Sequence, residues 1–242
     1  MNTLAIIGMG KMGHAIKAIS NLYKFKVSAE ISEYNQLINN NIKNVDIAIE
    51  FSTPDAAFEN IKWCLQNGIP VVSGTTGWTD RLPEIREMAD RSGTGFLYAS
   101  NFSIGMQITF HLNRQLARIM QRFPEFGARV HEVHHTQKAD KPSGTAKSLA
   151  EDITGNHSGY SGWALDADGR DPGGSILPVT AEREGTVHGI HEVTYQSPHE
   201  EIMLRHEAYD RTIFASGALQ AAKWLIGKKG SYTFTDFLNF EQ

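Results

Sequence analysis

The sequence has little of what several protein classes require. Its 242 residues include one cysteine, Cys64, so no disulfide can form within the chain. No apolar run reaches the roughly 18 residues that a membrane-spanning helix needs, and no signal peptide is apparent. The formal net charge of −4 provides no basic field for nucleic acid. We therefore expect a globular, cytoplasmic protein without nucleic-acid or membrane partners.

A glycine-rich turn follows the first apolar run, Leu4–Ile7, and precedes residues with helical spacing. Gly8, Gly10 and Gly13 have the G-x-G-x-x-G spacing of a dinucleotide-binding turn. The first glycine permits a tight turn, the second lets the backbone approach a pyrophosphate, and the third lets the helix pack on the strand. The free N–H groups of the helix N-terminus suit phosphates. A glycine turn that binds nothing is the alternative, but the strand-helix setting favours the dinucleotide interpretation.

An acidic residue near the end of the second predicted strand, residues 26–31, should hold the adenosine ribose. Glu30 and Glu33 are the candidates, and either could equally be a solvated carboxylate. Lys11 lies in the phosphate turn, where its charge would favour a 2′-phosphate, and a solvated lysine is an equal alternative. The choice between NADH and NADPH therefore stays open.

Strands and helices alternate along the first part of the chain. Apolar runs predict strands at residues 45–51, 70–73 and 95–99, with helices at residues 54–66 and 80–91 between them. This alternation predicts a Rossmann-type, doubly wound parallel sheet. Ligands of such sheets bind beyond the carboxyl ends of the strands. The turns 8–13, 74–77 and 99–102 should therefore line one cofactor cleft.

The pattern changes after Phe102 and predicts a second, mixed α+β domain. Residues 104–122 should form an amphipathic helix, with Ile108, Leu112, Leu116 and Ile119 on one stripe. Residues 154–174 are rich in Gly, Asp and Ser and are predicted to form a mobile loop. The next strands should pair as antiparallel hairpins; they are predicted at residues 176–183, 187–196 and 201–208.

A helix after Phe214 should return to the first sheet. We therefore assign residues 1–102 and 211–242 to a dinucleotide-binding domain. Residues 103–210 form the second domain, which we expect to bind substrate.

The stretch from Val130 to Ala146 concentrates titratable side chains, including three of the ten histidines. Its alternation predicts a strand on which His131 and His135 share one face and His134 faces the other way. We interpret His131 as strand packing. A zinc site would need three or four converging ligands, and no cysteine lies nearby, so we expect no metal.

Pro142-Ser143-Gly144-Thr145 has the pattern of a helix N-terminus. Ser143 can cap the helix, and the N–H groups of Gly144 and Thr145 can hold a carboxylate. Capping alone explains Ser143 but not the His134-His135-x-x-Lys138 run before it. A lysine beside an anion-binding turn suits a substrate with carboxylates. With a nicotinamide as hydride donor, a nearby proton donor suits the reduction of a C=N or conjugated C=C bond.

These residues resemble the dihydrodipicolinate reductase family, now named 4-hydroxy-tetrahydrodipicolinate reductase, of the diaminopimelate route to lysine. The most specific part is the signature His134-His135-x-x-Lys138-x-Asp140-x-Pro142-Ser143-Gly144-Thr145. The similarity extends over nearly the full chain, through Gly8-x-Gly10-x-x-Gly13, Gly74-Thr75-Thr76-Gly77, Ala99-Ser100-Asn101-Phe102-Ser103, and Arg211 with Phe214-Ala215-x-Gly217-Ala218.

The resemblance implies that His134 is the acid/base at the substrate and that Lys138 is the proton donor. It implies a dicarboxylate site that includes His135, Ser143, Gly144 and Thr145. NADH or NADPH would bind the turns of the first domain, for which the candidates are Gly8, Met9, Gly10, Lys11, Met12, Gly13, Glu30, Phe51, Gly74, Thr75, Thr76, Ala99, Ser100, Asn101, Phe102 and Arg211. Family members are usually homotetramers joined through the sheet of the C-terminal domain.

Three departures from the family pattern bear on the cofactor. The glycine turn is one residue shorter than the common form, the segment before Val45 is short, and Glu30 is not part of the usual acidic-basic pair. Two other functions remain as alternatives. A different NAD(P)-dependent amino-acid dehydrogenase would not need the Pro142–Thr145 motif after the histidines, and a non-catalytic NAD(P) sensor would need no proton donor.

Overall fold

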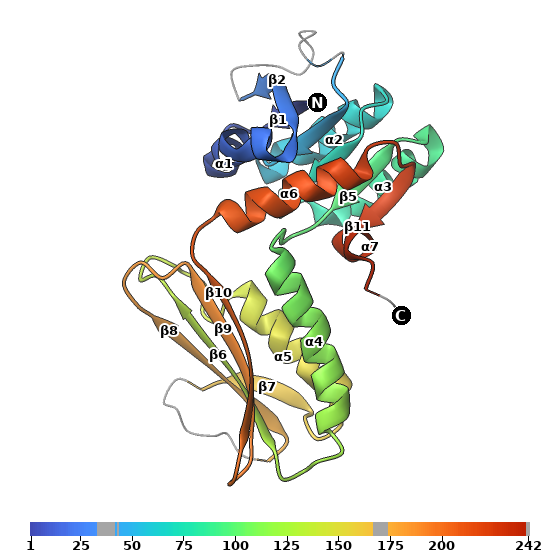
Figure 1. Cartoon of the computed structure of the whole chain (residues 1–242). Helices are drawn as coiled ribbons and strands as arrows, with labels where there is room; N and C mark the ends of the chain where they lie inside the picture. Colours follow the sequence, from blue (N-terminus) through green and yellow to red (C-terminus); the bar gives the residue numbers. More distant parts are fainter. Residues whose placement is uncertain (33–41, 43, 167–173, 241–242) are drawn as a thin grey trace. The chain divides into compact units, whose positions relative to one another are not determined.

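A computed structural model describes residues 1–32, 42, 44–166 and 174–240 and divides the chain into two compact units. Unit 1 contains Met1–Ile104 and Arg211–Gln242, and unit 2 contains Gly105–Asp210. Among the residues described, no helix is long and apolar enough to cross a lipid bilayer. Each unit has its own sheet and its own hydrophobic core (Figure 1).

Unit 1 is built on a six-stranded sheet with the order β11-β5-β4-β3-β1-β2. All its strand pairs are parallel, so the doubly wound sheet predicted from the sequence is confirmed. Its strands are β1 (Asn2–Ile7), β2 (Phe25–Ile31), β3 (Ile47–Glu50), β4 (Val71–Ser73), β5 (Gly95–Tyr98) and β11 (Gly230–Thr233). Its helices are α1 (Lys11–Ile19), α2 (Pro54–Gln66), α3 (Leu82–Ser92), α6 (Thr212–Leu225) and α7 (Phe234–Leu238). The strand β11 and the helix α7 were not predicted from the sequence.

Helices cover both faces of this sheet because successive strand residues point to opposite sides. Leu4 and Ile6 of β1 lie in the same core cluster as residues of α1 and α6. Ala5 and Ile7 lie in the cluster formed with α2 and α3. A strand buried on both faces has no polar alternation, which is why the run Leu4–Ile7 is uniformly apolar.

Unit 2 has a five-stranded mixed sheet with the order β10-β9-β6-β8-β7. Its strands are β6 (Gly127–His134), β7 (Gly162–Leu165), β8 (Ile176–Arg183), β9 (Gly189–Gln196) and β10 (Glu201–Ala208). The helices α4 (Ile104–Met120) and α5 (Gly144–Asn156) share its core cluster with Val130, Val179 and Val193, which lie on one face of the sheet (Figure 1). An ion pair between Arg114 and Asp152, 3.0 Å apart, links the two helices.

The apolar stripe predicted for α4 is not its buried face. Ile108, Leu112 and Ile119 are 41%, 46% and 46% exposed, and only Leu116 packs partly against the core. The buried residues of α4 are instead Met106, Thr109, Asn113, Ala117 and Met120. On this buried face, the Asn113 side-chain amide donates to the Leu149 carbonyl of α5 at 3.0 Å.

Two predictions for the strands of unit 2 are wrong. Residues 154–174 are not one loop, because α5 continues to Asn156 and Gly162–Leu165 form β7. The strand β7 pairs with β8. Residues 167–173 lie outside the described part of the chain. β8 and β9 do not form a hairpin, since β6 lies between them and is parallel to β8 and antiparallel to β9. Only β9 and β10 form the predicted hairpin. Local patterns do not encode which distant strand inserts into a sheet.

Candidate active site

The turns predicted to bind a dinucleotide lie side by side at the carboxyl edge of the unit 1 sheet. Backbone N–H groups connect each turn to the neighbouring strand. Gly8 donates to Ile31 at 2.8 Å, Phe51 to Ile7 at 2.8 Å, Gly74 to Glu50 at 3.0 Å and Ala99 to Ser73 at 3.2 Å. These bonds follow the order of the strands, so four segments that are separate in sequence form one edge.

The glycine turn fits a dinucleotide pyrophosphate. Gly8 has a φ of +96°, and a Cβ there would lie 2.1 Å from the Phe51 carbonyl oxygen. A Cβ at Gly13 would lie 2.1 Å from the Gly8 carbonyl oxygen, so this glycine allows α1 to approach β1. Gly10 differs, because a Cβ there would meet nothing within 4 Å. It is the N-cap of α1 and makes no side-chain capping bond, which suits a phosphate approaching the helix N-terminus.

The other candidates for cofactor binding have unequal access to solvent. Lys11, Thr76, Ser100 and Arg211 are exposed, whereas Met9, Met12, Phe51, Gly74 and Asn101 are half-buried, and Thr75 and Ala99 are buried. The Phe102 ring is buried between the rings of Phe51 and Phe234, with centroids 5.6 Å and 5.1 Å away. A Cβ at Gly74 would lie 2.2 Å from the Phe51 ring, so this glycine makes room for the aromatic cluster.

Of the two ribose candidates, Glu30 lies near the end of β2 and forms an ion pair with Lys17 of α1 at 2.7 Å. The pair is solvent-exposed, so it constrains Glu30 only weakly. Glu33 lies outside the described residues.

A buried carboxylate, Glu50, connects two of these turns and was missed in the sequence. The Ser73 hydroxyl donates to it at 2.7 Å, the Thr75 hydroxyl at 2.9 Å and the Ser52 backbone N–H at 2.8 Å. Its side chain is fully buried. The available signal was a charged residue at the end of an otherwise apolar strand.

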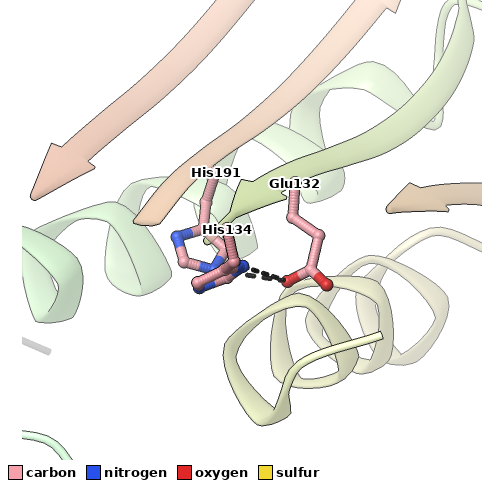
Figure 2. Close-up of side chains that lie close together, drawn as sticks. All are labelled: Glu132, His134 and His191. Carbon is pink, nitrogen blue, oxygen red and sulfur yellow. Dashed lines mark ion pairs between the residues drawn. The ribbon is translucent and has the colours of Figure 1, made fainter. Parts of the chain in front are cut away.

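In unit 2, Glu132, His134 and His191 form a buried cluster (Figure 2). Glu132 and His134 are two residues apart on β6 and therefore share the inner face of the sheet. His191 comes from β9, where it pairs in register with Glu132. Glu132 Oε2 lies 3.3 Å from His134 Nδ1 and 3.6 Å from His191 Nε2. The two imidazole rings meet edge to face, with centroids 5.0 Å apart.

Arg183, at the end of β8, holds the loop that follows β6. Its guanidinium lies 3.3 Å from Glu132 Oε1, and its Nε donates to the Lys138 carbonyl at 3.3 Å. It also donates to the Asp140 carbonyl. The Lys138 ammonium is 2.7 Å from the Asp140 carboxylate and is about three-quarters buried. The loop backbone that carries Lys138 is thus fixed to a strand of the sheet.

The predicted cap of α5 is present. Ser143 is the N-cap, and its hydroxyl accepts from the Ala146 N–H at 3.2 Å. The Ser143 backbone N–H donates to Glu132 Oε1 at 2.9 Å. Gly144 is exposed and Thr145 is half-buried, and a Cβ at Gly144 would meet nothing within 4 Å. The first turn of α5 contains no acidic residue, which leaves the positive end of the helix dipole uncompensated by its own sequence.

The electrostatics of this region favour a charged Glu132. Burial alone would raise the pKa of this carboxyl, but the contacts from His134, His191 and Ser143 outweigh burial and hold its pKa well below the usual value. Burial lowers the pKa of His191 more than Glu132 raises it, so His191 favours the neutral form. The hydrogen bond from Lys138 lowers the pKa of Asp140.

The three histidines of the predicted stretch have different places. His131 points away from His134, as predicted, and its Nδ1 lies 2.8 Å from the Thr180 hydroxyl. His135 follows the strand and is half-buried. Sequence reasoning missed Glu132, Arg183 and His191. One signal was available for Glu132, since it falls on the same alternating positions as the buried Ala128 and Val130.

The fold and these two sites define a two-unit α/β protein with a dinucleotide-type turn, a class that includes nicotinamide-dependent reductases. The family model for the dihydrodipicolinate reductase N-terminus matches residues 2–102, and the model for the C-terminus matches residues 105–238. The chain therefore belongs to the dihydrodipicolinate reductase family. The family, the fold class and an NAD(P)H-dependent reductase activity, all predicted from the sequence, are confirmed.

Relatives of known name agree with this assignment. The chain is 41% identical over 236 residues to the 4-hydroxy-tetrahydrodipicolinate reductase of Christiangramia forsetii, covering 98% of this chain and 97% of the relative. It is 35% identical over 201 residues to the enzyme of that name from Methanoregula boonei, covering 83% and 77%. Among solved structures, dipicolinate-bound dihydrodipicolinate reductase from Paenisporosarcina sp. TG-14 has a TM-score of 0.77 at 23% identity, covering 98% of both chains, and this likeness supports the fold.

Proposed function

We propose that this chain reduces the cyclic dicarboxylate derived from 4-hydroxy-tetrahydrodipicolinate to tetrahydrodipicolinate, with NADH or NADPH, in the diaminopimelate route to lysine. The observation that carries the proposal is the linkage of three segments of unit 2 by Glu132 and Arg183. They are the end of β6 with His134, the loop with Lys138, and the Ser143-capped start of α5. One compact region thereby offers an imidazole, an ammonium and a helix N-terminus.

Each segment has a chemical role in this proposal. The backbone N–H groups of Gly144 and Thr145, at the positive end of α5, hold a substrate carboxylate, with Ser143 and His135 beside them. The Lys138 ammonium donates the proton that completes reduction of the double bond. His134 acts as acid/base at the substrate. The Asp140 carboxylate, 2.7 Å from the ammonium, orients the Lys138 side chain.

A bound reduced nicotinamide supplies the hydride. In unit 1, the turn 8–13 holds its pyrophosphate, and the turns 74–76 and 99–102 with Phe51 line the remainder of the dinucleotide site. Glu30 is the proposed ribose ligand, which requires its exposed ion pair with Lys17 to open or to include the ribose hydroxyls. Lys11 and Arg211, both exposed, are the basic groups proposed to meet the cofactor phosphates.

We further propose a homotetramer in the cytoplasm, joined through the outer face of the unit 2 sheet. In the described part of unit 2, α4 and α5 share one core cluster with the inner face of the sheet. The outer face carries Arg129, His131 and Thr180, and Met203 is 46% exposed. Sedimentation velocity should give four chain masses, and Thr180→Arg should reduce the assembly. A monomer at micromolar concentration would refute this interface.

The activity is tested by the loss of absorbance of NADH or NADPH when substrate is generated in place by the preceding aldolase-type enzyme. We expect oxidation that depends on the substrate, and the two constants kcat and KM with each cofactor give the preference. Binding of NAD(P)H without any oxidation would favour the NAD(P) sensor. Reduction of NAD+ or NADP+ by an amino acid, without oxidation of NADH or NADPH by this substrate, would favour a different dehydrogenase.

A further inference from the structure

The buried carboxylate of Glu132 contacts His134, His191, Arg183 and the backbone of Ser143. Its Oε1 accepts from the Ser143 N–H at 2.9 Å and lies 3.3 Å from the Arg183 guanidinium. Its Oε2 faces the two imidazoles of His134 and His191 (Figure 2). The two oxygens therefore have different partners. Oε1 contacts the Ser143 backbone and Arg183, and Oε2 faces the two imidazole rings.

The atom of His134 that faces Oε2 is Nδ1, 3.3 Å away. A carboxylate oxygen accepts hydrogen bonds and cannot donate them, so a neutral imidazole facing Oε2 carries its proton on Nδ1 and its lone pair on Nε2. The cation that balances the Glu132 charge is Arg183, at the other oxygen.

The opposite edge of the His134 ring is bounded by Gly189 of β9. A Cβ at Gly189 would lie 3.1 Å from His134 Nε2, closer than side chains ordinarily pack. Its φ lies outside the left-handed region, so the backbone itself would accept a larger residue there. The glycine leaves space for the ring, and Glu132 fixes the ring from the Nδ1 side.

We propose that Glu132 is a positioning residue for the reduction: it selects the Nδ1–H tautomer of His134, holds the ring between itself and Gly189, and ties it to the Ser143 turn. The inference rests on the proposed function, because it gives His134 an acid/base role. Glu132 acts through His134 and the Ser143 backbone and does not itself touch the substrate. His191, 3.6 Å from the same oxygen, is the second ring that Glu132 contacts.

The same three residues also satisfy the ligand spacing of a metal site, since their ligand atoms lie within 4.8 Å of one another. The guanidinium of Arg183 argues against a divalent cation, because both would compete for the one negative charge of the cluster. We therefore assign the cluster to positioning, and metal content becomes an outcome of the test.

The isosteric variant Glu132→Gln gives a sharp test. Two donors face Oε1, so the glutamine carbonyl should take that place and retain the Ser143 bond. Its NH₂ group then faces His134 Nδ1 and donates to it, which moves the imidazole proton to Nε2. We expect kcat to fall about 10²-fold or more, as when an orienting carboxylate is lost, while substrate KM changes about threefold or less. Imidazole ¹⁵N shifts should report the reversed tautomer.

Glu182→Gln on β8 is the matched control, since it makes the same chemical change at an exposed position on the same sheet. It should alter neither kcat nor the ¹⁵N shifts. In the double variant with His134→Gln, Glu132→Gln should add little further loss, because the carboxylate acts through the ring. Unchanged kcat and tautomer in a folded Glu132→Gln protein would overturn the proposal. So would a stoichiometric divalent metal, measured by mass spectrometry, that this variant loses.

If Glu132→Gln fails to fold, Gly189→Ala perturbs the same ring from the other side, with Gly127→Ala as the control that meets nothing within 4 Å. We expect Gly189→Ala to lower kcat and Gly127→Ala to leave it unchanged. Equal activity of the two alanine variants would contradict the proposed restraint. The single variant His134→Gln distinguishes the acid/base role of His134 from the positioning role of Glu132. Normal turnover there would refute the role of His134, whereas a defect in His134→Gln without one in Glu132→Gln would refute positioning alone.

Discussion

The backbone N–H of Ser143 donates to Oε1 of Glu132 at 2.9 Å, so the start of α5 is fastened to the inner face of β6. The two partners are eleven positions apart in the sequence, and the Lys138 loop lies between them. The bond uses the backbone of Ser143 and leaves its hydroxyl to cap the helix. The cap and the strand contact can therefore be perturbed separately.

Ser143→Ala should remove the cap and keep the contact with Glu132. We expect the free energy of unfolding to fall by about 1 kcal/mol, the usual contribution of a serine N-cap. Because the hydroxyl is also a proposed substrate contact, KM for the substrate should rise. Urea unfolding and steady-state kinetics measure the two effects, with the exposed Ser148→Ala of α5 as control. Unchanged stability would show that water replaces the cap at no cost.

Lys138→Ala should lower turnover by about 10² or more, because the general acid is lost. Cofactor affinity should change little, since the cofactor site is proposed in unit 1. Stopped-flow measurement of hydride transfer and fluorescence titration with NADPH test the two statements. Lys147→Ala, at an exposed position of α5, controls for the loss of a positive charge. Near-normal turnover of Lys138→Ala would refute the assigned proton donor.

Gly8 and Gly10 should respond differently to substitution. Gly8→Ala places a Cβ 2.1 Å from the Phe51 carbonyl at a positive φ, so the protein should lose stability. A Cβ at Gly10 meets open space, so Gly10→Val should cost less stability than Gly8→Ala. The valine would instead occupy the space proposed for the pyrophosphate, and we expect the KM for NADH and NADPH to rise about tenfold or more. Normal cofactor KM in Gly10→Val would argue against this phosphate site.

Stability should fall as the pH drops below about 6.5, the pKa of a histidine in an unfolded chain. Burial lowers the pKa of His157 in the folded protein, so over this range the unfolded chain takes up a proton that the folded chain does not. The stability that buried His157 contributes in its neutral form is fully present above that pH. It is lost as the pH decreases toward the pKa of His157 in the folded protein. His157→Asn should flatten the profile of unfolding free energy against pH.

Burial also lowers the pKa values of His191 and His206, so some slope should remain in the His157→Asn variant. His199→Gln, at an exposed position, should reproduce the parent profile. An identical slope in the parent chain and in His157→Asn would show that His157 is accessible to protons in the folded state.

The sequence determined the elements whose signals are local. Uniformly apolar strands alternating with helices indicate a parallel sheet, and three spaced glycines after a strand indicate the dinucleotide turn. The run from His134 to Thr145 lies within one segment, so its histidines, lysine and capping serine were readable together. Each of these features is set by neighbours within a few residues, where chain geometry leaves few alternatives.

Tertiary structure alone decided what joins distant segments. Glu132 meets Arg183 and His191 because β6 lies between β8 and β9, and strand order is a non-local choice that alternation does not reveal. The same limit applies to α4, whose apolar stripe is exposed while Asn113, on its buried face, bonds to α5. Glu50 likewise acquires the Ser73 and Thr75 donors only when β3 and β4 pair. A buried charge is stable only with such partners, so its place is known when the packing is known.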